Sequence, residues 1–113
     1  MRLPNAEKAV VDEAKVRGYL LAPEHPVGRF KAAFFRSLGY TTADWQRLQD
    51  ALLSHAQTGD ASPEPSSTYG QKFRIRAMLQ GLAGRSAVIV SIWIIRPGDD
   101  QPRFVTAFPG ESP

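Results

Sequence analysis

In the first half of the chain, apolar residues recur every three or four positions, which is the period of an amphipathic helix. Asp12 is a suitable N-cap for a helix that runs to about Leu21, and the preceding segment 9–11 is apolar enough to form a short strand. Pro23 ends this helix, because a proline disfavours the helical conformation in the residue before it. A turn follows at 25–28, and the pattern predicts a second helix after that turn.

The second predicted helix ends at Leu38, before a glycine that can serve as its C-cap. A third helix begins near Thr41, whose spacing to Asp44 is that of a capping box. Its buried face is expected to consist of Trp45, Leu48, Leu52 and Ala56. Residues 58–67, TGDASPEPSS, are polar and proline-rich without any period, so we predict a mobile loop there.

After this loop the period changes to two. In QKFRIRAML, residues 71–79, basic and apolar residues alternate, as in a strand with one face in the core and one in water. The next predicted strand, 85–96, is apolar on both faces, as expected of a central strand, and RFVTAF at 103–108 predicts another. The whole chain, 1–113, is therefore predicted to be one α+β domain. Three N-terminal helices would pack on a C-terminal antiparallel meander of three to four strands.

Composition narrows the class of protein without indicating its activity. The 113 residues are 42% hydrophobic and 22% charged, which is ordinary for a globular domain. The chain contains no cysteine, which excludes a disulfide framework, a thiol nucleophile and a thiolate metal site. The longest apolar run, 87–95, is too short to cross a bilayer, so we expect a cytoplasmic protein with no membrane partner.

Positive charge is concentrated in the second half of the chain. The formal net charge is +3 and the isoelectric point is about 9.6. Between Tyr69 and Arg96 there is no acidic residue, whereas five residues are basic: Lys72, Arg74, Arg76, Arg85 and Arg96. Such a stretch favours an anionic partner such as nucleic acid. The alternative is a basic surface that faces only solvent, and charge alone favours that alternative.

The sequence contains no motif for a metal or a cofactor. There is no glycine-rich phosphate loop between a strand and a helix, no His-x-x-x-His pair and no EF-hand loop. The two histidines, His25 and His55, are far apart, and we expect a structural role for His55 in the last turn of the third helix. We therefore expect no metal and no cofactor. Any catalysis would use histidine, lysine, arginine and hydroxyl groups.

HPVGRFKAAFF, residues 25–35, is the first candidate site. On a helical projection Lys31 lies beside Phe35 in the apolar sector, where an ammonium group is unfavourable unless it reaches a partner or a cleft. His25 and Arg29 lie close to it in the sequence. The alternative is that Lys31 extends past Phe35 to water, and that His25 caps the helix or pairs with a neighbouring acid.

The predicted strands contain a second group of candidates. Lys72, Arg74 and Arg76 share one face, which could hold phosphates or could be a solvated face that discourages edge pairing. Thr106 has the same parity as two phenylalanines, so its hydroxyl is either hydrogen-bonded in the core or lines a cleft. Arg103 could join the same surface, although one sequence does not determine strand register.

Several blocks of the sequence together resemble a bacterial family of about this length. The blocks are LPNAEKAVV, YLLAPEHPVGRFKAAFF, YGQKFRIRAML, SIWII and PRFVTAF, within residues 3–108. The family is catalogued as a domain of unknown function. Its relatives look like the cargo of toxin–antitoxin or polymorphic-toxin loci, and their outline is similar to the barnase/EndoU/RelE-like ribonuclease fold. The resemblance implies site roles for His25, Arg29, Lys31 and Thr106. The tail, PGESP, continues beyond the expected end, so no role is carried over to a C-terminal group.

The first hypothesis is a toxin-like domain that cleaves RNA without a metal. RNA carries its own nucleophile, the 2′-hydroxyl, so the protein need supply only proton transfer and positive charge. His25 would be the general acid or base, and Lys31 with Arg29 would stabilise the charge that develops on the phosphate. Thr106 would position a phosphate oxygen or the attacking hydroxyl. The basic strand would hold the RNA backbone.

The second hypothesis is a non-catalytic protein-interaction module that uses the basic sheet face to bind an antidote or an assembly partner. A small-ligand pocket is a third. The expected partners are thus RNA and a neutralising antitoxin or immunity protein. Replacement of His25 by alanine discriminates the first two hypotheses, because only an enzyme would lose nearly all turnover. The sequence indicates neither the RNA target nor the oligomeric state.

Overall fold

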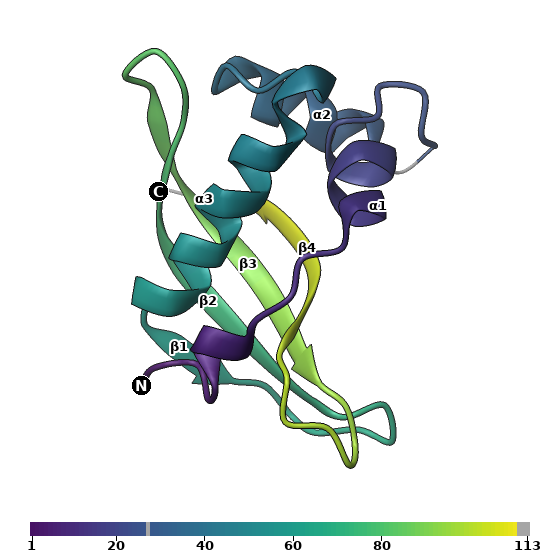
Figure 1. The fold of residues 1–113 in the computed structure, drawn as a ribbon, viewed down its shortest axis with the longest axis vertical. Helices are drawn as coiled ribbons and strands as arrows, with labels where there is room; N and C mark the ends of the chain where they lie inside the picture. The colour runs from purple at the N-terminus through teal and green to yellow at the C-terminus, as the bar shows by residue number, and fades with distance from the viewer. Residues whose placement is uncertain (27, 111–113) are drawn as a thin grey trace.

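The computed structural model describes residues 1–26 and 28–110, in which helices pack against a four-stranded antiparallel sheet (Figure 1). The strands are β1 (Ala61–Pro63), β2 (Gln71–Gln80), β3 (Ser86–Ile95) and β4 (Arg103–Pro109). They lie side by side in chain order, so each strand pairs with the next one. The predicted α+β class, with the helices before a meander of strands, is confirmed.

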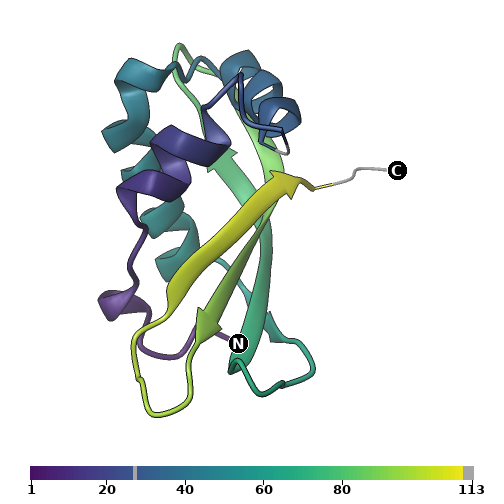
Figure 2. The same ribbon diagram turned by 90° about the vertical axis from the view of Figure 1, so that its right-hand side faces the viewer.

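The helical layer comes from the first half of the chain. A 3-10 turn, η1 (Ala6–Lys8), precedes α1 (Glu13–Lys15), which continues as the π-helical turn η2 (Val16–Leu20). The remaining elements are α2 (Arg29–Ser37), the 3-10 turn η3 (Thr42–Asp44) and α3 (Trp45–Thr58). Figure 2 shows α3 along the sheet and α2 near the end of β4. No helix in the described part of the chain has the length and apolar character needed to cross a membrane.

The predicted capping box is present at the start of the third helical segment. The Thr41 amide donates to Asp44 Oδ2 at 3.0 Å, and the Thr41 hydroxyl donates to the same oxygen at 2.9 Å. These bonds lower the pKa of the Asp44 carboxyl, because they favour its charged form. The chain therefore enters η3 and α3 at the point that the local spacing predicts.

The core lies between the helices and one face of the sheet. Phe73, Ile75 and Leu79 of β2 are buried, and they belong to the same cluster as Leu48 and Leu52 of α3. The residues between them on β2 are more exposed, as the period of two predicted. Removal of these large apolar side chains from water is the main stabilising contribution to the fold.

One hydrogen-bonded polar network lies within this core. His55 of α3 is only 3% exposed, and its Nδ1 lies 2.8 Å from the hydroxyl oxygen of Ser91. Its Nε2 donates to the Ala77 carbonyl oxygen at 3.0 Å, and the Trp93 indole N–H donates to the Ser91 oxygen at 2.8 Å. Because a carbonyl can only accept, the ring proton is on Nε2 and Ser91 donates to Nδ1. A neutral His55 therefore satisfies the network, which is the structural role expected from the sequence.

His55 makes the stability of the protein dependent on pH. Burial lowers the pKa of His55 because the imidazolium is disfavoured in the core, and hydrogen bonds with the Ala77 and Ile89 backbone oppose this shift. Below about pH 6.5 the unfolded chain therefore binds a proton that the folded chain does not bind. We expect the free energy of unfolding to be level above that pH and to fall below it, by at most about 1.4 kcal/mol per pH unit.

Urea unfolding at several pH values between about 7.5 and 5 measures this dependence. The His55→Gln variant is expected to lose the slope that His55 contributes. His25→Gln is the matched control and should keep it, since His55 remains in place. Equal slopes in the wild-type protein and both variants would contradict the assignment.

Two segments differ from the sequence prediction. Within 58–67, expected to be a loop, Ala61–Pro63 forms β1 and pairs with β2. A proline is tolerated there because β1 is an edge strand. The segment 9–11 forms no full strand, since only Val10 makes a bridge, parallel to the start of β4. The mobility of the remaining part of 58–67 stays a prediction.

Candidate functional site

Three of the four residues predicted to act in catalysis meet around Tyr19. The Tyr19 hydroxyl lies 3.2 Å from Thr106 Oγ1 on β4. The His25 imidazole packs edge-on against the Tyr19 ring, with the two centroids 5.2 Å apart. Lys31 Nζ lies 5.8 Å from the Tyr19 ring centroid and 5.6 Å from that of Phe108. We call Tyr19, His25, Lys31, Thr106 and Phe108 the Tyr19 cluster.

The cluster forms where α2 approaches the second half of β4 (Figure 2). Tyr19 belongs to the π-helical turn η2, and His25 belongs to the turn before α2. Lys31 lies in the first turn of α2, while Thr106 and Phe108 lie on β4 with the same parity. Three separate parts of the chain therefore contribute to one site.

Backbone groups at the start of α2 hold both the ring and the main chain of His25. The Gly28 amide donates to His25 Nδ1 at 2.9 Å, and the Arg29 amide donates to the His25 carbonyl oxygen at 3.0 Å. Because Nδ1 accepts a hydrogen bond, a neutral His25 carries its ring proton on Nε2. Proton transfer between His25 and a substrate would therefore use Nε2.

The close approach of two chain segments requires a glycine at position 28. A Cβ atom at Gly28 would lie 2.2 Å from the Tyr19 carbonyl oxygen, well inside contact distance. The missing side chain lets the turn that carries His25 pack directly on the segment that carries Tyr19.

Lys31 is half-buried on the side of α2 that faces the rest of the protein, as the helical projection predicted. Its ammonium lies near the rings of Tyr19 and Phe108, and such cation–π contacts favour a cation at a partly desolvated position. Within residues 1–26 and 28–110, no carboxylate pairs with Lys31. The Tyr19 cluster thus contains a positive charge that no acidic side chain of that part neutralises.

Arg29, the fourth predicted catalytic residue, lies outside the cluster. Its guanidinium is 4.7 Å from the centroid of the Phe30 ring, and Phe30 is 70% exposed. Residues two positions apart on a helix do not face the same side. Lys31 can therefore approach β4 while Arg29 lies at the surface.

Lys72, Arg74 and Arg76 alternate with the buried residues of β2 and therefore lie on the opposite side of the sheet from the core. We call this side of the sheet the basic face. Arg74 and Arg76 are exposed, whereas Lys72 is half-buried. Figure 2 shows α1 and α3 on the other side of the sheet.

The strand register places Thr106 and Phe108 of the Tyr19 cluster on the same side of the sheet as the basic face. Arg74 pairs with Ile92 of β3, and Ile92 pairs with Thr106 of β4. Arg76 is joined in the same way, through β3, to Phe108. Directly paired residues project to one side of a sheet, and two strand spacings, roughly 10 Å, separate β2 from β4. An extended anionic chain could therefore contact both groups at once.

Arg103, the remaining predicted RNA contact, interacts with its own turn. Its Nε lies 3.5 Å from Asp99 Oδ2, and its Nη2 lies 3.5 Å from Gln101 Oε1. The pKa of Asp99 is lowered, chiefly by the hydrogen bond from the Gln101 amide and in part by Arg103. Asp99 therefore offsets much of the charge that Arg103 brings to this end of β4.

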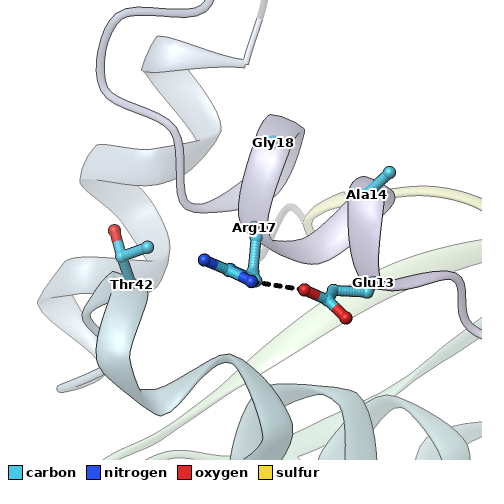
Figure 3. A pocket seen from close by; sticks show the side chains of 5 residues that line it. All are labelled: Glu13, Ala14, Arg17, Gly18 and Thr42. Carbon is cyan, nitrogen blue, oxygen red and sulfur yellow. Dashed lines mark hydrogen bonds and ion pairs between the residues drawn. The ribbon is translucent and has the colours of Figure 1, made fainter.

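Open hollows on the described surface include two that contain arginine side chains. The first, of about 460 Å³, is lined by Asp60, Ser62, Arg74 and Arg76. The second, of about 570 Å³, is lined by Glu13, Ala14, Arg17, Gly18 and Thr42 (Figure 3). Arg17 is ion-paired with Glu13 in the second hollow, so its charge is already matched. Residues 1–26 and 28–110 contain no cluster of three or more side chains suited to a metal ion.

Tyr19 and Lys15 were not among the residues singled out from the sequence. Lys15 Nζ also lies close to the Tyr19 ring, 5.6 Å from its centroid. Their four-residue spacing places them on one side of a helix, which is the only local signal that they carry. The Tyr19–Thr106 contact spans 87 positions, so no spacing within the sequence marks it.

Comparison with known proteins gives a family and a fold relative. Residues 2–111 match the model of a family described as "Domain of unknown function (DUF6883)". No curated protein matches the chain. A solved chain from a "Contact-dependent growth inhibition toxin - immunity protein complex" of Klebsiella pneumoniae 342 has a TM-score of 0.70 and 18% identity. The match covers 95% of this chain and 97% of that chain, and at this identity it shows the fold alone.

Proposed function

We propose that this chain, which belongs to the DUF6883 family, is a toxin-like domain that cleaves RNA without a metal ion. The family description names no activity, so the chemistry of the site has to support the proposal. The observation that carries it is the convergence of His25, Lys31 and Thr106 on Tyr19, with Thr106 on the same side of the sheet as the basic face.

RNA needs little from such a site, because its 2′-hydroxyl is the nucleophile. The 2′-oxygen forms a bond to phosphorus while the bond from phosphorus to the 5′-oxygen breaks. The products are a 2′,3′-cyclic phosphate and a 5′-hydroxyl. The 2′-hydroxyl loses one proton to solvent and the 5′-oxygen gains one from the protein, to which solvent returns a proton. The reaction therefore needs no oxidant, reductant or other reactant.

His25 transfers one of these protons through Nε2. A neutral ring has its proton there, while Nδ1 accepts the Gly28 amide. As a general acid, His25 must carry a proton on both ring nitrogens, and in that form Nδ1 no longer accepts the Gly28 amide. The imidazolium can then give its Nε2 proton to the leaving 5′-oxygen. Of its two predicted roles, we assign His25 that of the general acid in this step.

Lys31 stabilises the charge that develops on the phosphate. Its ammonium is half-buried, where a fixed cation acts more strongly than it would in water. Thr106 positions a phosphate oxygen from the neighbouring strand. Arg29, at the surface of α2, would contact the RNA beyond the phosphate that is cleaved.

Lys72, Arg74 and Arg76 hold the RNA backbone, with Arg103 at the end of the interface. The logarithm of the binding constant is therefore expected to fall linearly with the logarithm of salt concentration, by about 0.7 for each phosphate contact. In the Arg74→Gln variant the slope should be smaller by about 0.7, the contribution of one phosphate contact. Arg47→Gln, at an exposed position on α3, is the matched control and should leave the slope unchanged. Fluorescence anisotropy with a labelled RNA measures it, and a flat salt response would contradict the electrostatic contact.

The proposal is tested by incubating the purified chain with single-stranded RNA in EDTA at low salt. We expect cleavage with 2′,3′-cyclic phosphate ends, and no cleavage of a DNA of the same sequence, which lacks the nucleophile. Failure to cleave a broad set of RNAs, or equal cleavage of the DNA, would overturn the proposal.

The complex that contains the fold relative joins a toxin to an immunity protein, and this supports a second candidate function. In that case the chain is a non-catalytic module that binds a protein partner through the basic face. Such a module would bind its partner equally well after His25→Ala, and it would cleave no RNA. If the chain is instead a toxin, we propose that its neutralising partner covers the same face.

A further inference from the structure

Two lysines from different elements converge on the Tyr19 ring. Lys15 Nζ, at the end of α1, lies 5.6 Å from the ring centroid, and Lys31 Nζ, on α2, lies 5.8 Å from it. Both side chains are half-buried. α1 and α2 thus each place one positive charge beside the same phenol.

Neither ammonium has an acidic partner in the described part of the chain. The ion pairs there use the N-terminal amine, Lys8, Arg17 and Arg103. At a partly buried position each ammonium interacts more strongly with an anion than it would in bulk water. A cation–π contact stabilises each ammonium, but it adds no negative charge. The arrangement therefore favours the binding of an anion.

The hydroxyl pair of Tyr19 and Thr106 supplies a hydrogen-bond donor at the end of the same tyrosine ring. Their oxygens lie 3.2 Å apart, and only one of the two hydroxyls can donate in that bond. The other hydroxyl still has a proton to donate. A hydroxyl donor together with ammonium groups is a set that proteins use to bind phosphate oxygens.

We propose that Lys15, Tyr19, Lys31 and Thr106 form a site for a phosphate group that carries two negative charges. This inference rests on the proposed RNA cleavage and assigns Lys15 and Tyr19 to it. A phosphodiester in RNA carries one negative charge, whereas the phosphorane-like transition state gains a second. The second ammonium therefore binds the transition state more strongly than the substrate, and it raises kcat more than it lowers KM.

Inorganic phosphate is the first probe, at about pH 8, where most of it is a dianion. In an NMR titration of the wild-type chain we expect the amide signals of 15–20, 28–31 and 104–108 to shift. Lys15→Met and Tyr19→Phe should each weaken phosphate binding about tenfold or more. Lys8→Met removes a surface lysine that is paired with Asp100, so this matched control should bind as the wild type does. Equal affinities in all four proteins would overturn the proposal.

RNA cleavage kinetics are the second measurement. Lys15→Met is expected to lower kcat about 10- to 100-fold with little change in KM, and Lys15→Arg should restore most of the rate because it keeps the charge. A purely structural role for Lys15 would lower the thermal midpoint and leave kcat unchanged in the folded protein. A change in KM alone would also overturn the assignment.

The two proposals fail separately in these experiments. If the wild-type chain binds phosphate at the Tyr19 cluster but cleaves no RNA, the phosphate-site proposal stands and the ribonuclease proposal is overturned. If the chain cleaves RNA and Lys15→Met behaves like Lys8→Met in both assays, the ribonuclease proposal stands and the role of Lys15 as a second cation is overturned.

Discussion

Cleavage of RNA by the His25→Ala variant is expected to be about 10²- to 10⁴-fold slower than cleavage by the wild-type protein, the usual loss for a general acid–base catalyst. The reason is local, because no second histidine can take over: His55 is buried in a saturated network in the core. The His25 side chain is only half-buried, so it contributes less to packing than a core residue does. The thermal midpoint of the variant should therefore change little. Single-turnover cleavage in EDTA, with unfolding curves of both proteins, measures the two effects.

Two controls make this result specific. Glu24→Ala changes the exposed residue next to His25 and should keep wild-type activity. Imidazole added to the solution should restore part of the His25→Ala rate, because it can occupy the space of the missing ring and transfer the proton. A His25→Ala variant that cleaves as fast as the wild type would exclude His25 from the mechanism. It would also favour the interaction module.

Among glycine-to-alanine substitutions near the site, Gly28→Ala is expected to lower the free energy of unfolding most. The new methyl group would lie 2.2 Å from the Tyr19 carbonyl oxygen, so the turn and the η2 segment must move apart. Such overpacking typically costs about 1–3 kcal/mol of the free energy of unfolding. The same movement breaks the hydrogen bond from the Gly28 amide to His25 and displaces Tyr19. We therefore expect RNA cleavage to be lost as well. Urea unfolding and the cleavage assay measure both.

Gly18→Ala is the matched substitution. A Cβ at Gly18 would meet no atom within 4 Å, and the residue lies in the helical segment η2. Alanine is favoured over glycine in helices by up to about 1 kcal/mol, so this variant should be as stable as the wild type or slightly more stable. Equal destabilisation of both variants would show that the approach of Gly28 to Tyr19 has no special importance.

Features that depend on residues close in the sequence were predictable. The capping box of Thr41 and Asp44 follows from a spacing of three, and the two faces of β2 follow from a period of two. The helical period likewise placed Lys31 on the inner side of α2. In each case the residues that determine the feature lie within one or two turns of helix or within one strand, so local rules are sufficient.

Features that depend on distant residues were not predictable. Tyr19 meets Thr106 across most of the chain, and nothing in either segment indicates the other. The sequence predicted Arg103 as a cation available for RNA, but the fold places it beside Asp99 and Gln101. β1 is polar and contains a proline, and it is a strand because the edge of β2 offers it backbone hydrogen bonds. Such pairings depend on the assembled sheet rather than on the pattern of either partner.

The strict chain order of the strands also determines when during folding the site can exist. β2 and β3 pair along their whole lengths across the short connection 81–85, so this hairpin can form from contacts that are near in sequence. Thr106 belongs to the last strand, whereas Tyr19 and His25 come from the first quarter of the chain. Contacts at such long separations form late, because a large loop must first be closed. A partly synthesised chain would therefore already carry the basic residues of β2, but the Tyr19 cluster would be incomplete until β4 is made and docked.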